Sequence, residues 1–163
     1  MQGMSIERII YNECVIKIFD SELEKFHLLE TGGILLGYVL KKTIYIEIAS
    51  GPGTRAIHEP YYFKADPDYI DMFIDMEIAN SGGKLRYIGE WHSHLQIVPE
   101  PSNLDLNSIS EIAESSNDLC SLLIIGAFDF KVSSFLQQSI SIIKYSGKQK
   151  FYSLPSAIYS RKL

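Results

Sequence analysis

Apolar residues recur along the chain at two spacings, one typical of strands and the other typical of helices. Runs that alternate apolar and polar residues, or that are rich in Ile, Val, Leu and Tyr, predict strands, whereas apolar residues three and four positions apart predict helices. The expected strands cover residues 8–19, 33–40, 43–49, 85–93, 119–130 and 138–145, and the expected helices cover residues 21–31, 66–80 and 102–115. Strands and helices are therefore interspersed along the chain.

Turn and cap residues mark several of these boundaries. Lys41 and Lys42 would turn a hairpin between the two strands that flank them. Asp66 followed by Pro67 has the form of an N-cap and a first helical residue, which predicts the start of the second helix. The third helix would turn three apolar residues inward, namely Leu104, Ile109 and Ile112.

Two segments lack a clear pattern. Residues 54–64 are expected to form a loop with a short strand. In the tail, residues 146–163, Phe151, Tyr152 and Leu154 could pack as a last strand or contact a partner. Because 163 residues can bury one core and no repeat or linker interrupts the chain, we expect a single domain over residues 1–163.

The composition narrows the possible functions. A net charge of −5 without a basic stripe argues against nucleic-acid binding. The two cysteines, Cys14 and Cys120, have neither metal-like nor disulfide-framework spacing, which fits a reducing cytoplasm. No basic leader precedes an apolar core and no apolar run approaches about 20 residues, so neither secretion nor a membrane span is expected.

The residues best suited to chemistry lie between positions 88 and 105. His92 and His94 end a predicted strand, and the two-residue period of a strand would point both imidazoles to one face, where they could bind one metal ion. Catalytic zinc commonly takes three protein ligands and keeps a fourth position for water. Asp105 is the preferred third ligand, because a loop with two prolines would turn the chain back toward the imidazoles.

Two alternatives stay open for these side chains. Glu90 shares the predicted strand face with the histidines, so it could orient an imidazole or replace Asp105 as a ligand. Ser102 and Asp105 also have the spacing of a capping box, in which case they would only begin a helix.

Glu30 is unusual for the C-terminal end of the first predicted helix. Leu23, Phe26 and Glu30 recur at helical spacing, so Glu30 would share the inward face with apolar residues, and Gly32 and Gly33 would end the helix. Helix C-termini favour cations, and an inward carboxylate is unfavourable without a partner. Glu30 therefore either has a partner at a site or lies exposed on a frayed helix end.

Together these residues resemble the motif of the JAB/JAMM (MPN-type) zinc metalloproteases. That motif is a distant Glu, then His-Ser/Thr-His, seven residues, Ser, two residues and Asp. The spacing agrees at every position, and such a set of fixed gaps is far more specific than His-x-His alone. The matching residues are Glu30, His92, Ser93, His94, Ser102 and Asp105.

The resemblance covers most of the chain and implies the fold, the cofactor and the residue roles. The implied fold is mixed α/β, a cytidine-deaminase-like three-layer arrangement with a curved mixed sheet between helices. The implied cofactor is Zn²⁺, bound by His92, His94 and Asp105. Glu30 would be the general base, and Ser102 would donate a hydrogen bond to the oxyanion of the tetrahedral intermediate.

Three segments, 30–37, 51–53 and 88–94, further resemble small stand-alone prokaryotic members of this family, which are found in mobile elements and in anti-phage operons. Some of these are similar to deubiquitinases and release a conjugated cGAS-like nucleotidyltransferase, so we interpret the chain as a zinc-dependent isopeptidase. The expected partner is a ubiquitin-like or nucleotidyltransferase conjugate, whose extended C-terminal tail would be recognised by strand addition to a sheet edge. Leu95 departs from the proline frequent after the second His, which leaves the following loop less rigid.

Two other functions stay open. One is the release of cysteine or another small amine from a ubiquitin-like sulfur-carrier protein, which would use the same metal site. The other is a non-catalytic MPN interaction module, since some family members lack the ligands. The presence of every motif residue argues against such a module.

Overall fold

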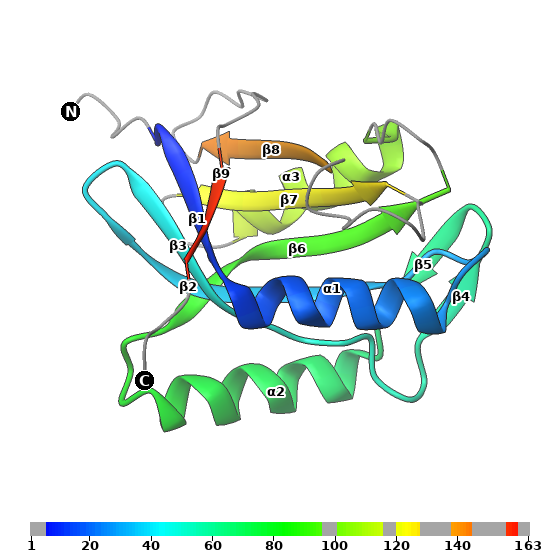
Figure 1. Ribbon diagram of the computed structural model, residues 1–163, viewed down its shortest axis with the longest axis horizontal. Helices are drawn as coiled ribbons and strands as arrows, with labels where there is room; N and C mark the ends of the chain where they lie inside the picture. Colours follow the sequence, from blue (N-terminus) through cyan, green and yellow to red (C-terminus); the bar gives the residue numbers. More distant parts are fainter. Residues whose placement is uncertain (1–5, 96–100, 116–119, 128–137, 145–155, 160–163) are drawn as a thin grey trace.

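A seven-stranded mixed sheet organises the part of the chain that the computed structural model describes, residues 6–95, 101–115, 120–127, 138–144 and 156–159 (Figure 1). The strand order is β8-β7-β6-β2-β3-β1-β9. The strands are β1 (Arg8–Asn12), β2 (Gly32–Leu40), β3 (Thr43–Ala49), β6 (Arg86–His94), β7 (Cys120–Ala127), β8 (Gln138–Lys144) and β9 (Ser156–Tyr159). The histidine-bearing strand β6 lies inside the sheet, antiparallel to β2 on one side and parallel to β7 on the other.

Helices lie on both faces of this sheet (Figure 1). Helix α1 (Glu13–Lys25) buries Phe19 against Trp91 of β6, with ring centroids 4.5 Å apart. Helix α3 (Asn103–Ser115) brings Asp105 to His92, the next residue of β6. Because successive side chains of a strand point to opposite faces, α1 and α3 cover opposite faces. This arrangement confirms the expected mixed α/β class with a mixed sheet between helices.

The first predicted strand and helix had wrong boundaries. The strand ends at Asn12, whose side chain accepts a hydrogen bond from the Cys14 amide and caps α1. Helix α1 therefore begins eight residues before Ser21, in a run of β-branched residues that reads locally as a strand. It ends at Lys25, so Glu30 is not helical and Gly32 begins β2 instead of ending a helix.

Other boundaries agree with the sequence prediction. Strands β2 and β3 form the expected hairpin, and Lys41 in its turn has a positive φ of 55°. The ambiguous segment 54–64 contains two short strands, β4 (Ile57–Glu59) and β5 (Tyr62–Lys64), which pair with each other. In the tail, β9 lies at Ser156–Tyr159 and pairs in parallel with β1, and the strand predicted at Phe151, Tyr152 and Leu154 falls outside the described residues.

Helix α3 covers the expected range but turns a different face inward. Ile109 is buried, as predicted. Leu104 is 60% exposed, so the prediction that it packs inward was wrong. The helix is rotated so that Asp105, one residue on, points toward the sheet, where it contacts His92 and His94.

Helix α2 (Pro67–Asn80) begins as predicted, with Asp66 as its N-cap and Pro67 in its first turn. The Asp66 side chain is only 4% exposed, accepts hydrogen bonds from the Tyr69 and Arg55 amides, and pairs with the Arg55 guanidinium at 3.3 Å. These hydrogen bonds and the ion pair outweigh burial, so the pKa of Asp66 lies below its ordinary value. The cap thus also holds the preceding loop.

We expect Asp66→Ala to lower the free energy of unfolding by about 1–3 kcal/mol, since it removes an N-cap and leaves the Tyr69 and Arg55 amides without their acceptor. Chemical denaturation measures this loss. Asp68→Ala is the matched control, because Asp68 pairs with the same Arg55 but is 79% exposed, so its removal should cost less than about 0.5 kcal/mol. Equal losses in the two variants would contradict the proposed role of the cap.

Candidate metal centre

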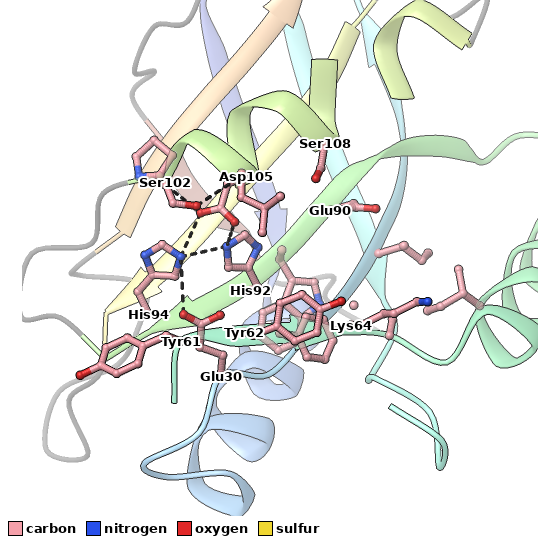
Figure 2. Close-up of a pocket in the computed structure, with 18 of the residues that line it drawn as sticks. Glu30, Tyr61, Tyr62, Lys64, Glu90, His92, His94, Ser102, Asp105 and Ser108 are labelled. Atoms are coloured by element: carbon pink, nitrogen blue, oxygen red, sulfur yellow. Dashed lines mark hydrogen bonds and ion pairs between the residues drawn. The ribbon is translucent and has the colours of Figure 1, made fainter. Parts of the chain in front are cut away.

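Strand β6 places two imidazoles side by side on the face that α3 covers (Figure 2). His92 and His94 are both buried, and their Nε2 atoms are 3.1 Å apart. A ring nitrogen binds a metal ion through its lone pair, so both Nε2 atoms would be the unprotonated ring nitrogens in a metal-bound state. The two imidazoles therefore turn their Nε2 atoms toward one shared point.

The first turn of α3 supplies a carboxylate to the same point. Asp105 Oδ1 lies 3.2 Å from His92 Nε2, and Oδ2 lies 3.0 Å from His94 Nε2. Burial alone would raise the pKa of Asp105, but the hydrogen bonds from both histidines outweigh burial and hold its pKa well below its ordinary value. Asp105 is therefore an anion throughout the physiological pH range.

Ser102 and Asp105 also form the capping box that their spacing allows. The Ser102 amide donates to Asp105 Oδ2 at 2.8 Å, and the Asp105 amide donates to Ser102 Oγ at 3.1 Å. The two readings of this pair are compatible, because the carboxylate that caps the helix faces the imidazoles at the same time. The cap fixes the orientation of the Asp105 side chain.

These donor atoms fit a zinc ion. The three side chains offer two imidazole nitrogens and a carboxylate oxygen, which lie within 4.8 Å of one another. Their closest separations, 3.0–3.2 Å, are near the edge of about 3.3 Å that a tetrahedron needs when its metal bonds are about 2.0–2.1 Å. Three protein ligands of this kind leave one tetrahedral position for water. The residues are His92, His94 and Asp105.

Glu30 approaches this cluster from the segment between α1 and β2. Its Oε1 lies 3.9 Å from His94 Nε2, and the residue is only 8% exposed (Figure 2). Burial raises the pKa of the Glu30 carboxyl, and the neighbouring His94 and His92 oppose that rise. The carboxylate thus has the partner that its inward position requires.

The backbone around Glu30 is fixed by residues distant in sequence. The Glu30 amide donates to the Glu59 carbonyl at 2.9 Å, and the Glu30 carbonyl accepts from His58 Nδ1, also at 2.9 Å. The next amide, that of Thr31, donates to Ser93 Oγ at 3.0 Å. Glu30 is therefore held by the β4–β5 hairpin on one side and by β6 on the other.

His58 is a positioning residue that the sequence did not indicate. Its ring stacks on Phe26 with centroids 3.7 Å apart and planes within 9°, which fixes the direction of Nδ1. His58 lies in the segment whose pattern was ambiguous, 28 residues from Glu30, so no local spacing links the two. Only the docking of the hairpin onto the end of α1 reveals the contact.

Glu90 lies outside the cluster of donor atoms. It shares the strand face with His92, as the alternation predicts, but the donor atoms grouped within 4.8 Å do not include its carboxylate. No hydrogen bond joins Glu90 to an imidazole among the described residues. Burial raises the pKa of its carboxyl. The geometry therefore favours Asp105 over Glu90 as the third donor.

A cavity of about 760 Å³ opens over the cluster. Its lining includes Glu30 and the three donors, and it extends beyond them between α3 and the segment from β5 to α2. A metal ion and a water molecule fill only a small part of such a volume, which is typical of pockets that hold a larger ligand. The remaining space is available to a substrate.

Comparisons with known proteins agree with this fold. The family model described as "Prokaryotic homologs of the JAB domain" matches residues 14–138. The chain belongs to the JAB/JAMM family, in its prokaryotic branch. No helix in the described part of the chain is both long and apolar enough to cross a membrane.

Three of the curated relatives are named "CD-NTase/cGAS isopeptidase". That of Pseudomonas aeruginosa is 30% identical over 126 residues, which are 72% of this chain and 80% of the relative. That of Escherichia coli is 23% identical and covers 83% of this chain and 86% of the relative. A further relative, "Probable metalloprotease y4qB" of Sinorhizobium fredii, is 30% identical over 106 residues, which are 63% of this chain and 64% of the relative.

A solved structure shares the fold. Protein DSY2949 from Desulfitobacterium hafniense aligns with a TM-score of 0.65 at 13% identity, over 94% of each chain. At this identity the likeness concerns the fold alone.

Proposed function

We propose that this protein is a zinc-dependent isopeptidase that hydrolyses the amide bond joining the C-terminal tail of a conjugated protein to its target. The observation that carries the proposal is a buried carboxylate, that of Glu30, 3.9 Å from His94 and beside the three-donor cluster. Family membership and the names of the relatives support the same reaction class.

Each side chain has a distinct task in this proposal. Bound zinc supplies a Lewis acid for the scissile carbonyl and a water whose pKa falls to about 7. Oε1 of Glu30 accepts the proton of the attacking water and passes it to the leaving nitrogen. Ser102 Oγ accepts a hydrogen bond from the Asp105 amide, so its own proton is free to be donated to the oxyanion.

The proposed substrate is a protein with an extended C-terminal tail, of the cGAS-like nucleotidyltransferase class by analogy with the relatives. Five consecutive residues, 61–65, line the cavity, which is expected where the edge of a strand borders it. Among the described residues, β5 pairs only with β4, so its other edge can accept a further strand. A tail laid there by strand addition would lead to the cluster.

The alternative of a non-catalytic module is disfavoured by the assembled cluster, since a module would have no need of a carboxylate buried beside two imidazoles. Release of a small amine from a sulfur-carrier protein would use the same residues. The extent of the cavity beyond the cluster favours a larger leaving group.

A cleavage assay tests the proposal. A nucleotidyltransferase of this class, fused through its C-terminus to a reporter, should be cut at the junction by the zinc-loaded protein. Adding a chelator should stop the cleavage, and removing the last four residues of the tail should reduce it by at least about tenfold, because strand addition needs that backbone. Cleavage that resists the chelator would contradict the metal dependence. Cleavage that is indifferent to the tail would contradict the recognition.

His58→Phe should lower kcat by about tenfold with KM and zinc affinity unchanged, because the ring can still stack on Phe26 but no longer donates to the Glu30 carbonyl. Steady-state kinetics and zinc titration measure this. His58→Asn keeps a donor and should recover part of kcat. The matched control is His27→Phe. His27 is an exposed histidine in the segment between α1 and β2. A His58→Phe variant with kcat within twofold of the parent would remove His58 from the positioning network.

A further inference from the structure

Glu90 is a second carboxylate in the cavity that the proposed reaction does not use. It lies on β6 two residues before His92, and its side chain is on the side of His92 away from His94 (Figure 2). Both Glu90 and Ser108 line the cavity there. This end of the cavity is therefore chemically distinct from the metal cluster.

The Glu90 side chain is partly buried. Among the described residues, no hydrogen bond or ion pair reaches it, although Lys64 and Asp71 line the same cavity. A carboxylate removed from water without a partner is unfavourable, so a side chain that keeps this position commonly binds a ligand. The missing partner would be a cation or a strong hydrogen-bond donor.

The surroundings define what kind of cation fits. Tyr62 and Ile70 line the cavity with apolar surface, and Ser108 adds a hydroxyl near its acidic floor. A long side chain with an apolar stem and a charged tip matches such a lining, because the stem packs on the walls while the tip pairs with the acid. Arginine and lysine have this form.

The spacing along the strand locates the residue that would enter. Glu90 and His92 are two residues apart, which in a strand is about 6.6 Å. A substrate tail extended along β5 advances by about 3.3 Å per residue. A side chain from one of the two residues nearest the scissile amide is therefore within reach of Glu90.

We propose that Glu90 forms the floor of a specificity subsite that binds a basic side chain, arginine or lysine, of the substrate tail within two residues of the scissile amide. The subsite rests on the proposed isopeptidase function and narrows its substrate class. It predicts that tails with a neutral residue at these positions bind more weakly.

A binding cycle tests the subsite without relying on catalysis. The probes are acetylated, C-terminally amidated tetrapeptides of glycine and alanine with arginine at the last or the penultimate position, and the same peptides with citrulline, which has nearly the same shape but no charge. Affinity is measured by calorimetry on zinc-loaded Glu30→Gln protein, with and without Glu90→Gln. Asp71→Asn is the matched control, because Asp71 is an exposed carboxylate that lines the same cavity.

At one of the two positions, the arginine peptide should bind at least about tenfold more tightly than the citrulline peptide. Glu90→Gln should reduce this preference to less than about threefold, whereas Asp71→Asn should leave it in place. A preference below threefold with Glu90 intact, a preference that survives Glu90→Gln, or no binding of either arginine peptide would overturn the subsite. Failure of the fusion-cleavage assay would contradict the isopeptidase function instead. The peptide affinities could still be measured and compared in that case.

Discussion

Glu30→Gln is expected to lower kcat for amide hydrolysis by about 10²–10⁴-fold while zinc affinity stays within about threefold. The carboxamide has the same shape as the carboxylate and keeps the backbone contacts to His58 and Glu59, but it cannot accept a proton. Oε1 of Glu30 is 3.9 Å from His94, but Glu30 is not in the group of donor atoms that lie within 4.8 Å of one another, so its place differs from that of the three donors.

Single-turnover cleavage of the reporter fusion measures the loss, and competition with a chromophoric chelator measures the zinc affinity. Glu24→Gln is the matched control, because Glu24 is an exposed glutamate of α1 and its change should leave both quantities unaltered. A Glu30→Gln variant that keeps more than a tenth of the parental kcat would exclude Glu30 as the general base. Loss of zinc affinity in step with kcat would instead make it a ligand.

Ser102 has two roles to be distinguished, the proposed donor to the oxyanion and the cap of α3. Ser102→Ala should lower kcat by about 10²-fold, less than the upper range for Glu30→Gln, because one oxyanion donor contributes roughly 3 kcal/mol. Its capping hydrogen bond from the Asp105 amide is lost as well, so Ser102→Thr, which keeps the hydroxyl, distinguishes the two effects. Threonine should retain most of kcat if the hydroxyl is what matters.

The arrangement of the cluster could be predicted because its determinants are local. His92 and His94 share a face through the period of one strand, and Asp105 follows after a short connection into the first turn of a helix. The cap residues Ser102 and Asp105 fix where this helix begins, and the capping box forms as their spacing allows. Strand alternation was therefore sufficient for the two histidines and capping for the start of the helix, whereas the inward position of Asp105 also depends on the rotation of α3, which the apolar pattern did not predict.

The position of Glu30 could not be predicted in the same way. The sequence placed it on a helix, and in the structure it follows α1 across a short segment in which Leu28 has a positive φ of 77°. Packing against β6 decides where α1 lies, because Phe19 stacks near Trp91, and the β-branched run before it is helical despite its strand-like pattern. The contacts that fix Glu30 come from His58 and Ser93, both distant in sequence.

Asp105→Ala is expected to weaken zinc binding by at least about 10²-fold and to abolish hydrolysis, because it removes one of three donors and leaves the two imidazoles without their anion. Thermal unfolding gives a readout independent of activity. Zinc at about 100 times its dissociation constant stabilises the parent by about 2.7 kcal/mol, which for a chain of this size is roughly 5–10 °C in Tm. The Asp105→Ala variant should show less than about 2 °C at the same zinc concentration.

The capping role of Asp105 has to be separated from its role as a donor, because the Ser102 amide bonds to its Oδ2. Asp105→Asn keeps an acceptor for that amide, so its metal-free Tm should stay near the parental value while the zinc-induced rise in Tm is lost. Asp75→Ala, which removes an exposed aspartate of α2, should retain the full rise. If Asp105→Asn kept that rise, the anion beside His92 and His94 would serve only the helix cap, and the third donor would have to be sought elsewhere in the cavity.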